Sequence, residues 1–265
     1  MEWFTGLVMA DSMTDADVAM RAALSGAAVV RSRYGTKPLR VAQTGVDFTT
    51  EADVETDRAI RAVLSELRPE DAIVGEELGT SGESARRWLV DPICGTMNFS
   101  AGLPVFAVNV ALEVDGTTRV AAVVDPVAGH AFRTDGVTAW RRADGVETVL
   151  TPTSWSRLVS VNLESTYPNR DGARLLWDEA VRSRFSPRCL SSTLALAWVA
   201  SGQQAAYVTG GDLRGSVHWT AGILLCQVAG AVVTNLAGGE LHTGDHGMLA
   251  AADAETHALL LEAMK

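Results

Sequence analysis

The sequence predicts a layered α/β protein, and three observations support this fold class. Two stretches near the N-terminus have the capping residues and apolar spacing of helices. Short apolar runs bounded by turn residues come next, which is typical of buried strands. Beyond about residue 151, helical and strand-like segments alternate. We therefore expect an α+β half over residues 1–150 and an α/β half over residues 151–265.

Local signals place the two N-terminal helices. Thr14 and Asp17 have the spacing of a capping box ahead of an alanine-rich stretch, so the first helix is predicted to run from near Thr14 to about Arg33. A second helix is predicted from Thr50. Apolar residues recur there at helical spacing until Pro69, which cannot continue a helix.

Turn signals then divide a β-rich middle. Asp115-Gly116 lies between two apolar runs and predicts a hairpin, and Asp135-Gly136 and Asp144-Gly145 predict two more turns. The strands expected in the first half include residues 73–74, 88–90, 105–114 and 119–124. In the second half we expect strands at 158–163, 232–234 and 248–251, and helices at 172–184, 193–200 and 221–228, with a closing helix after them.

Composition narrows the class of function. The chain carries 22 Lys and Arg against 32 Asp and Glu, a net charge of −10, so it lacks the basic excess that nucleic-acid binding needs. With 47% hydrophobic residues it can bury a sizeable core. No apolar run reaches the roughly 18 residues of a membrane span, and the N-terminus lacks the pattern of a secretory signal. We expect a cytoplasmic globular protein that binds neither nucleic acid nor membrane.

The three cysteines predict reduced thiols. Cys94, Cys189 and Cys226 form no Cys-x-x-Cys pair and no plausible disulfide framework. Cys189 and Cys226 lie on apolar segments, so we expect both in the core.

Acidic side chains gather where predicted elements begin or end. They lie in the stretches 47–53, 75–77 and 91–99, and strand ends commonly deliver such residues to a shared cleft. Carboxylates gathered in this way repel one another unless a divalent cation neutralises them. For any single acidic residue, a solvated surface position is the alternative.

Taken together, the stretches resemble the inositol monophosphatase family of metal-dependent phosphatases. That family pairs a Gly-Glu-Glu turn with Asp-Pro-Ile-Asp-Gly-Thr, and this chain has Gly75-Glu76-Glu77 and Asp91-Pro92-Ile93-Cys94-Gly95-Thr96. The resemblance continues through Asn98-Phe99, Gly102-Leu103-Pro104-Val105-Phe106, Val124-Asp125-Pro126, residues 192–202, Ala221-Gly222 and Ala229-Gly230. It implies a layered αβαβα sandwich and a homodimer.

The resemblance also implies a metal site. In such phosphatases, two or three Mg²⁺ ions hold the phosphate, lower the pKa of a bound water and stabilise the departing alkoxide. Glu76 and Asp91 would bind the first ion together with the Ile93 carbonyl group. Thr96 would orient the nucleophilic water, and Asp53 would hold a further metal or its waters.

Substrate contacts are expected from two regions. The backbone N–H groups of the helix that starts after the Asp91 motif, at Gly95 and Thr96, are candidates for binding the phosphate. Asp212 and Arg214 lie in the region that touches the alcohol part of the substrate in family members. The alternative for these two is a glycine-rich turn between a strand and a helix.

The sequence departs from the family pattern at two metal ligands. Cys94 stands at the second Asp of Asp-Pro-Ile-Asp. If Gly222 fixes the register of the family's Trp-Asp-x-Ala-Ala-Gly motif, His218 stands where its Asp belongs. Pairing Trp219-Thr220 with Trp-Asp instead would move the glycine out of place, so we prefer the first register.

Three interpretations of Cys94 and His218 follow. They bind Zn²⁺ together with Asp91, since thiolate, imidazole and carboxylate suit that ion. They act without metal as a thiolate and a general base. In the third interpretation, Cys94 is a small buried apolar residue and His218 is a histidine whose hydrogen bonds are satisfied. Mg²⁺ prefers oxygen, so we expect it at a reduced number of sites, and a protein without any bound metal stays an alternative.

The resulting functional hypothesis is hydrolysis of a phosphorylated sugar, inositol or nucleotide at an altered or weakened metal centre. Glu76, Thr96, Cys94 and His218 are the candidate catalytic residues. Two alternatives stay open. One is a non-hydrolytic catalyst of specialised metabolism, a cyclase or lyase that uses Cys94 and His218, and the other is a binding protein without catalysis.

Overall fold

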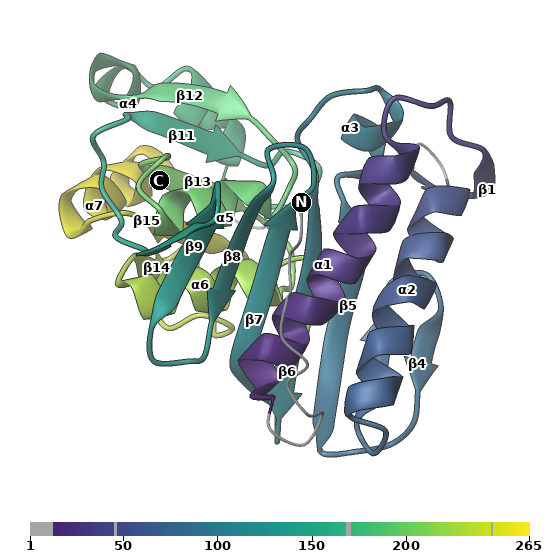
Figure 1. The fold of residues 1–265 in the computed structure, drawn as a ribbon. Coiled ribbons are helices and arrows are strands. Elements are labelled where there is room, and N and C mark those ends of the chain that lie inside the picture. Colours follow the sequence, from purple (N-terminus) through teal and green to yellow (C-terminus); the bar gives the residue numbers. More distant parts are fainter. Residues whose placement is uncertain (1–12, 45–46, 168–170, 245) are drawn as a thin grey trace.

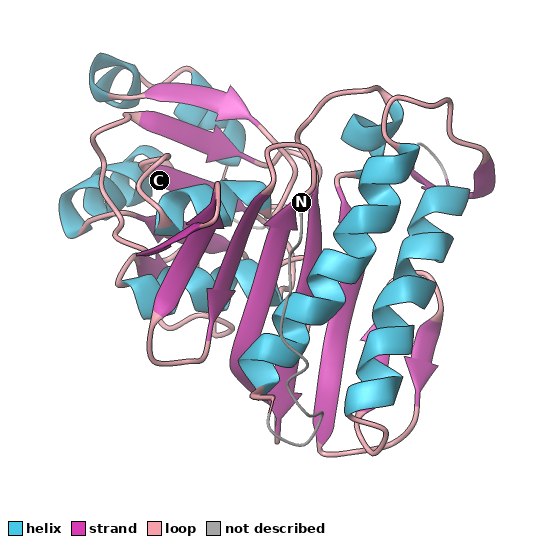
Figure 2. Ribbon diagram, viewed as in Figure 1, coloured by secondary structure: helices cyan, strands magenta, loops and turns pink. Residues whose placement is uncertain are grey.

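The computed structural model describes residues 13–44, 47–167, 171–244 and 246–265. Helices and sheets alternate in five layers in the order α, β, α, β, α (Figures 1 and 2). The layered αβαβα fold expected from the sequence is therefore confirmed.

The first layer consists of α1 (Asp15–Arg33) and α2 (Glu51–Leu67), which pack side by side on one face of the larger sheet. The Thr14 side chain accepts a hydrogen bond from the backbone N–H of Asp17 and so caps α1. Both helices agree with the prediction to within about two residues.

The second layer is an eight-stranded sheet with the strand order β10-β9-β8-β7-β6-β5-β3-β4. Only β3 and β5 pair in parallel, and the other neighbours are antiparallel. The three predicted turns join β6 to β7, β8 to β9 and β9 to β10. The strands are β3 (Ala72–Gly75), β4 (Gly79–Ser81), β5 (Arg86–Cys94), β6 (Ala107–Val114), β7 (Thr117–Asp125), β8 (His130–Thr134), β9 (Ala139–Ala143) and β10 (Val146–Val149).

The remaining layers come from the second half of the chain, whereas the short helix α3 (Thr96–Ser100) follows β5 within the first half. Helices α5 and α6 lie between the two sheets, and the second sheet has the order β12-β11-β13-β15-β14. Its outer face carries α4 and α7. The elements are β11 (Leu158–Val161), α4 (Glu179–Arg184), β12 (Ser186–Cys189), α5 (Leu194–Ala200), β13 (Ala206–Thr209), α6 (Thr220–Ala229), β14 (Val232–Thr234), β15 (Met248–Ala251) and α7 (Ala254–Ala263).

Two parts of the prediction are wrong. The helix expected over 172–184 is interrupted, because Asp178 accepts a hydrogen bond from the Val181 N–H and starts α4 anew after a 3₁₀ turn over Gly172–Leu176. Cys189 is exposed rather than buried, since it ends an edge strand, whereas Cys226 is buried as expected. The short pair β1 (Arg40–Thr44) and β2 (Asp47–Thr50) was not expected, and neither were β12 and β13 of the second sheet.

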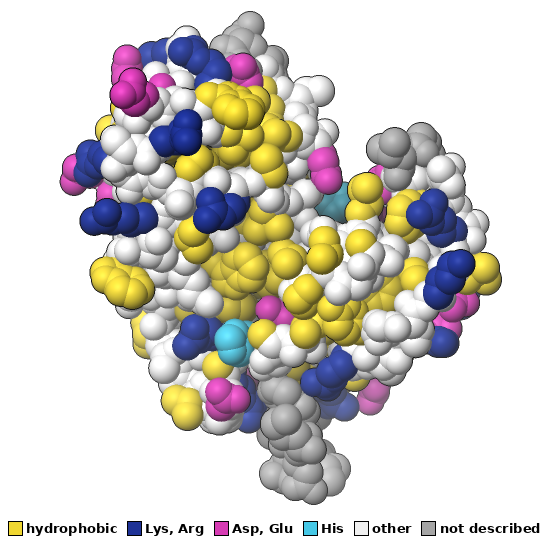
Figure 3. All heavy atoms as spheres, turned by 90° about the horizontal axis from the view of Figure 1, so that it is seen from above, with side chains coloured by type: hydrophobic (Ala, Val, Ile, Leu, Met, Phe, Trp, Pro, Cys, Tyr) yellow, Lys and Arg dark blue, Asp and Glu magenta, His cyan; other side chains and the backbone are white. Residues whose placement is uncertain are grey.

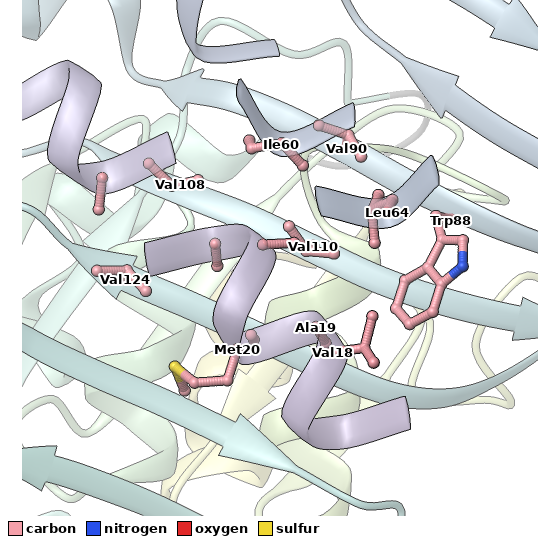
Figure 4. Packing of buried hydrophobic residues seen from close by; sticks show 14 of the residues in the cluster. Val18, Ala19, Met20, Ile60, Leu64, Trp88, Val90, Val108, Val110 and Val124 are labelled. Carbon is pink, nitrogen blue, oxygen red and sulfur yellow. The ribbon is translucent and has the colours of Figure 1, made fainter. Parts of the chain in front are cut away.

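Buried side chains tie the layers together. Between α1, α2 and the large sheet, Val18, Ile60 and Trp88 belong to one apolar cluster (Figure 4). A second cluster joins the other face of that sheet to α5 and α6, and Cys94 belongs to it. The two halves of the chain therefore share one interior, and the end of β5 lies at their junction. None of the described helices is long and apolar enough to cross a membrane.

Candidate active site

A cavity of about 620 Å³ lies where the end of β5 meets the second half of the chain. Its lining includes the carboxylates of Asp47, Glu76 and Glu164 and the imidazole of His218, and no Lys or Arg among the described residues lines it. The view from above shows a notch between two lobes, with acidic side chains and a histidine in it (Figure 3). An anion as charged as a phosphate would be repelled here unless a cation were bound.

Strand β5 supplies Cys94 to the lining of this cavity and also carries the buried Asp91. Residues three apart on a regular strand face opposite sides of the sheet. The pairing of β5 with β6 shifts register between Asp91 and Cys94, across Pro92 and Ile93. This irregularity, of the kind that re-aims side chains near active sites, allows the carboxylate and the sulfur to lie on the same side.

His218 reaches the same point from the turn before α6. Its Nδ1 lies 2.8 Å from Oδ2 of Asp91, and its Nε2 lies 3.9 Å from Oε1 of Glu76. One donor atom from each of Asp91, Cys94 and His218 lies within 4.8 Å of the other two. The structure thus brings Cys94 and His218 together in the register that Gly222 suggested, and Thr220 is not part of the lining.

Two buried polar residues that the sequence reasoning missed hold this group in place. The Thr193 N–H donates to Sγ of Cys94 at 3.2 Å, and its hydroxyl lies 3.1 Å from the same sulfur. That hydroxyl also donates to the backbone carbonyl of His218. Asn109 donates from Nδ2 to the Thr193 hydroxyl at 2.9 Å and to the His218 carbonyl at 3.1 Å.

Asp53 and Thr96 form a second polar group beside the first. The Thr96 hydroxyl lies 3.1 Å from Oδ1 of Asp53 and 3.1 Å from the Ile93 carbonyl oxygen. Oδ2 of Asp53, at the start of α2, accepts hydrogen bonds from the N–H and the hydroxyl of Thr50. Asp53 is fully buried, so these contacts fix its orientation.

Burial and neighbouring charges shift the protonation of the site. Burial raises the pKa of Asp53 to about 6, although hydrogen bonds from Thr50 and Thr96 oppose the shift. Burial and the charge of Asp91 raise the pKa of Glu76. Burial lowers the pKa of His218, but its hydrogen bond with Asp91 outweighs that effect and raises the pKa above its usual value.

The surroundings of Cys94 raise the pKa of its thiol on balance, although the neighbouring His218 acts to lower it. Burial raises the pKa of Cys94, and the charge of Asp91 raises it further. Reactive cysteines have a lowered pKa and partial exposure, whereas Cys94 is only 5% exposed. Without a metal, the geometry argues against the thiolate mechanism that the sequence left open.

The family pattern has a first and a second metal position that share Asp91. The residues present fit Mg²⁺ at the first position and do not fit it at the second. Glu76, Asp91 and the Ile93 carbonyl group offer the oxygen donors that Mg²⁺ requires. At the second position the donors are the sulfur of Cys94 and the imidazole of His218, which Mg²⁺ disfavours.

The structure places two of the four expected substrate-binding residues at the cavity and the other two away from it. Gly95 and Thr96 line the cavity, and Gly95 adopts a left-handed conformation at φ 112° that favours glycine. Asp212 and Arg214 pair with each other at the surface, 2.6 Å apart, and neither lines this cavity. Arg214 borders a different cavity near α6.

The fold and the site together define an α/β sandwich with a cleft lined by carboxylates. The model of the inositol monophosphatase family matches residues 11–265. The chain is 39% identical over 130 residues to the inositol-1-monophosphatase of Mycobacterium leprae, a match that covers 43% of this chain and 45% of that protein. It is 32% identical over 241 residues to the Nus factor SuhB of Salmonella typhimurium, with 84% and 85% covered.

Solved structures agree with the fold. SuhB of Mycobacterium tuberculosis matches with a TM-score of 0.71 and 28% identity over 94% of this chain and 96% of that one. The IMPase of Thermotoga maritima matches with a TM-score of 0.77 and 22% identity over 95% and 98%. The chain belongs to the inositol monophosphatase family, which is generally metal-dependent.

Proposed function

We propose that the protein hydrolyses phosphate monoesters of small polar metabolites, such as sugar, inositol or nucleotide phosphates. The observation that carries the proposal is the contact of the Thr96 hydroxyl with both Asp53 and the Ile93 carbonyl group at the edge of the cavity. This arrangement suits the activation of a water molecule. Family membership supports the same reaction class.

A bound cation is part of the proposal, because the lining of the cavity carries carboxylates and no Lys or Arg among the described residues. Glu76, Asp91 and the Ile93 carbonyl group would hold one Mg²⁺ ion. When bound, that ion would bind the phosphate and lower the pKa of a water molecule.

The chain's own residues then accept the proton that the attacking water molecule loses. The Thr96 hydroxyl has one hydrogen and two acceptors within reach, so it donates to Asp53 or Ile93 and keeps a lone pair for a water molecule. A proton taken from that water passes by way of Thr96 to Asp53. General-base groups contribute about 10²- to 10⁴-fold to a rate.

The remaining lining suits the alcohol part of a substrate. Asp47, Asn162, Glu164 and Ser165 line the same cavity and offer polar atoms to hydroxyl groups. Its volume of about 620 Å³ lies in the range of small-molecule sites. We therefore assign substrate selection to these residues ahead of Asp212 and Arg214.

The test is phosphate release from a panel of sugar, inositol and nucleotide phosphates in the presence of MgCl₂. We expect Thr96→Val to lower the turnover number at least about 100-fold and Thr96→Ser, which keeps the hydroxyl, to retain most of it. EDTA should abolish activity. The proposal is wrong if no ester is hydrolysed, if EDTA has no effect, or if Thr96→Val is as active as the unmodified protein.

A further inference from the structure

We propose that Asp91, Cys94 and His218 form a zinc site at the junction of β5 and α6. The site goes beyond the proposed hydrolysis, because zinc binding can be measured whether or not a phosphate ester is turned over. The Mg²⁺ proposed at Glu76, Asp91 and Ile93 is a neighbouring ion that shares Asp91.

The donor set is the first argument. One carboxylate oxygen, one sulfur and one ring nitrogen lie within 4.8 Å of one another. Zinc binds sulfur at about 2.3 Å, and nitrogen and oxygen at about 2.0–2.2 Å, so at tetrahedral angles two ligands of one ion lie about 3.3–3.7 Å apart. Side-chain movements of about 1 Å would therefore bring all three atoms onto one ion.

The second argument is an unpartnered oxygen. Asp91 is completely buried, and while its Oδ2 contacts His218, its Oδ1 has no hydrogen-bond partner among the described residues. A buried polar atom without a partner costs free energy of folding. A cation held beside the carboxylate would satisfy it.

The third argument is the support behind the ligands. The Thr193 N–H points at the Cys94 sulfur, which favours a metal-bound thiolate. Thr193 and Asn109 both donate to the backbone carbonyl of His218 and so hold the residue that carries the imidazole. Metal ligands are commonly held by such outer hydrogen bonds.

The site also has an open side. The His218 side chain is 42% exposed and lines the cavity, whereas Asp91 and Cys94 are buried beneath it. Three protein ligands with a fourth position facing a cavity are the composition of catalytic zinc sites. A zinc ion there would be reached by the phosphate or the leaving oxygen of a substrate.

Metal content after loading tests the proposal directly. The purified full-length chain is stripped with a chelator, loaded with ZnCl₂, dialysed against excess MgCl₂, and its zinc is measured by elemental analysis. We expect one zinc ion per chain. Cys94→Ser and His218→Gln should lower zinc affinity by more than the roughly 10- to 100-fold that outer hydrogen-bond partners are worth.

Cys189→Ser and His246→Gln are matched controls of the same residue types outside the group, and both should retain zinc. Cobalt loading of the unmodified protein gives a readout that needs no variant, since a sulfur-bound cobalt ion shows a charge-transfer band in the near ultraviolet. Failure to retain zinc, equal retention by the Cys94 and control variants, or bound cobalt without that band would overturn the zinc site. Loss of phosphatase activity alone would not.

Discussion

Replacing Thr193 by valine removes one hydroxyl group and keeps the shape of the side chain. That hydroxyl donates to the His218 carbonyl group, accepts from Asn109 and contacts the Cys94 sulfur, so two hydrogen bonds between oxygen and nitrogen groups and one weaker sulfur contact are lost. Asn109 still donates to the same carbonyl at 3.1 Å, so neither partner is left alone. At about 1 kcal/mol per hydrogen bond, we expect the free energy of unfolding to fall by about 2 kcal/mol.

Thr193→Ser is the control, because it keeps the hydroxyl and loses only a buried methyl group, which is worth about 0.8 kcal/mol. Urea unfolding measures both changes from the midpoint at a constant m-value. Zinc retention separates the variants further, since only valine removes the hydroxyl contact with the Cys94 sulfur. The reasoning is refuted if Thr193→Val loses less than about 0.5 kcal/mol, or if serine loses zinc as readily as valine.

Two further predictions concern other parts of the molecule. A methyl group on Gly26 would lie 2.8 Å from both Cδ1 and Cγ1 of Ile60, so Gly26→Ala should lower the melting temperature despite a helix propensity gain of about 1 kcal/mol. Ile60→Ala, which removes both atoms, should reduce that loss in a double-mutant cycle. A loss unaffected by Ile60→Ala would contradict the assigned contact. Burial lowers the pKa of His257, whose Nε2 lies 2.7 Å from the Thr234 hydroxyl. Its contribution to stability is therefore complete above the usual pKa of 6.5 and is lost as the pH falls below it. His257→Gln should make the free energy of unfolding, measured by urea titration, decline less between about pH 7.5 and pH 5.5, and an unchanged decline would count against this assignment.

Local chemistry explains which elements the sequence could predict. Asp115 and Gly116 both have positive φ, at 52° and 73°, the conformation that an Asp-Gly hairpin turn requires. The capping pair Thr14 and Asp17 is equally local. Such features depend on a few neighbouring residues, so a pattern in the sequence is enough to find them.

Features that depend on contacts between residues far apart in the chain could not be predicted from the sequence. Asn109 and Thr193 are 84 positions apart and meet only because the fold brings β6 beside the start of α5. Neither belongs to a spacing pattern. Strand β12 is a short edge strand that contains Pro187, and its polar composition gives no strand signal. The proximity of Cys94 and His218 followed from the family resemblance, whereas their distances to Asp91 required coordinates.

The exposed thiol of Cys189, at the end of β12, can be labelled chemically. Cys94 and Cys226 are enclosed, so a maleimide dye added to the folded protein would label Cys189 selectively. Ser191, two residues further along, lines the cavity. A fluorophore at Cys189 would therefore be attached two residues from the cavity lining, where its emission could report the arrival of metal or metabolite in real time.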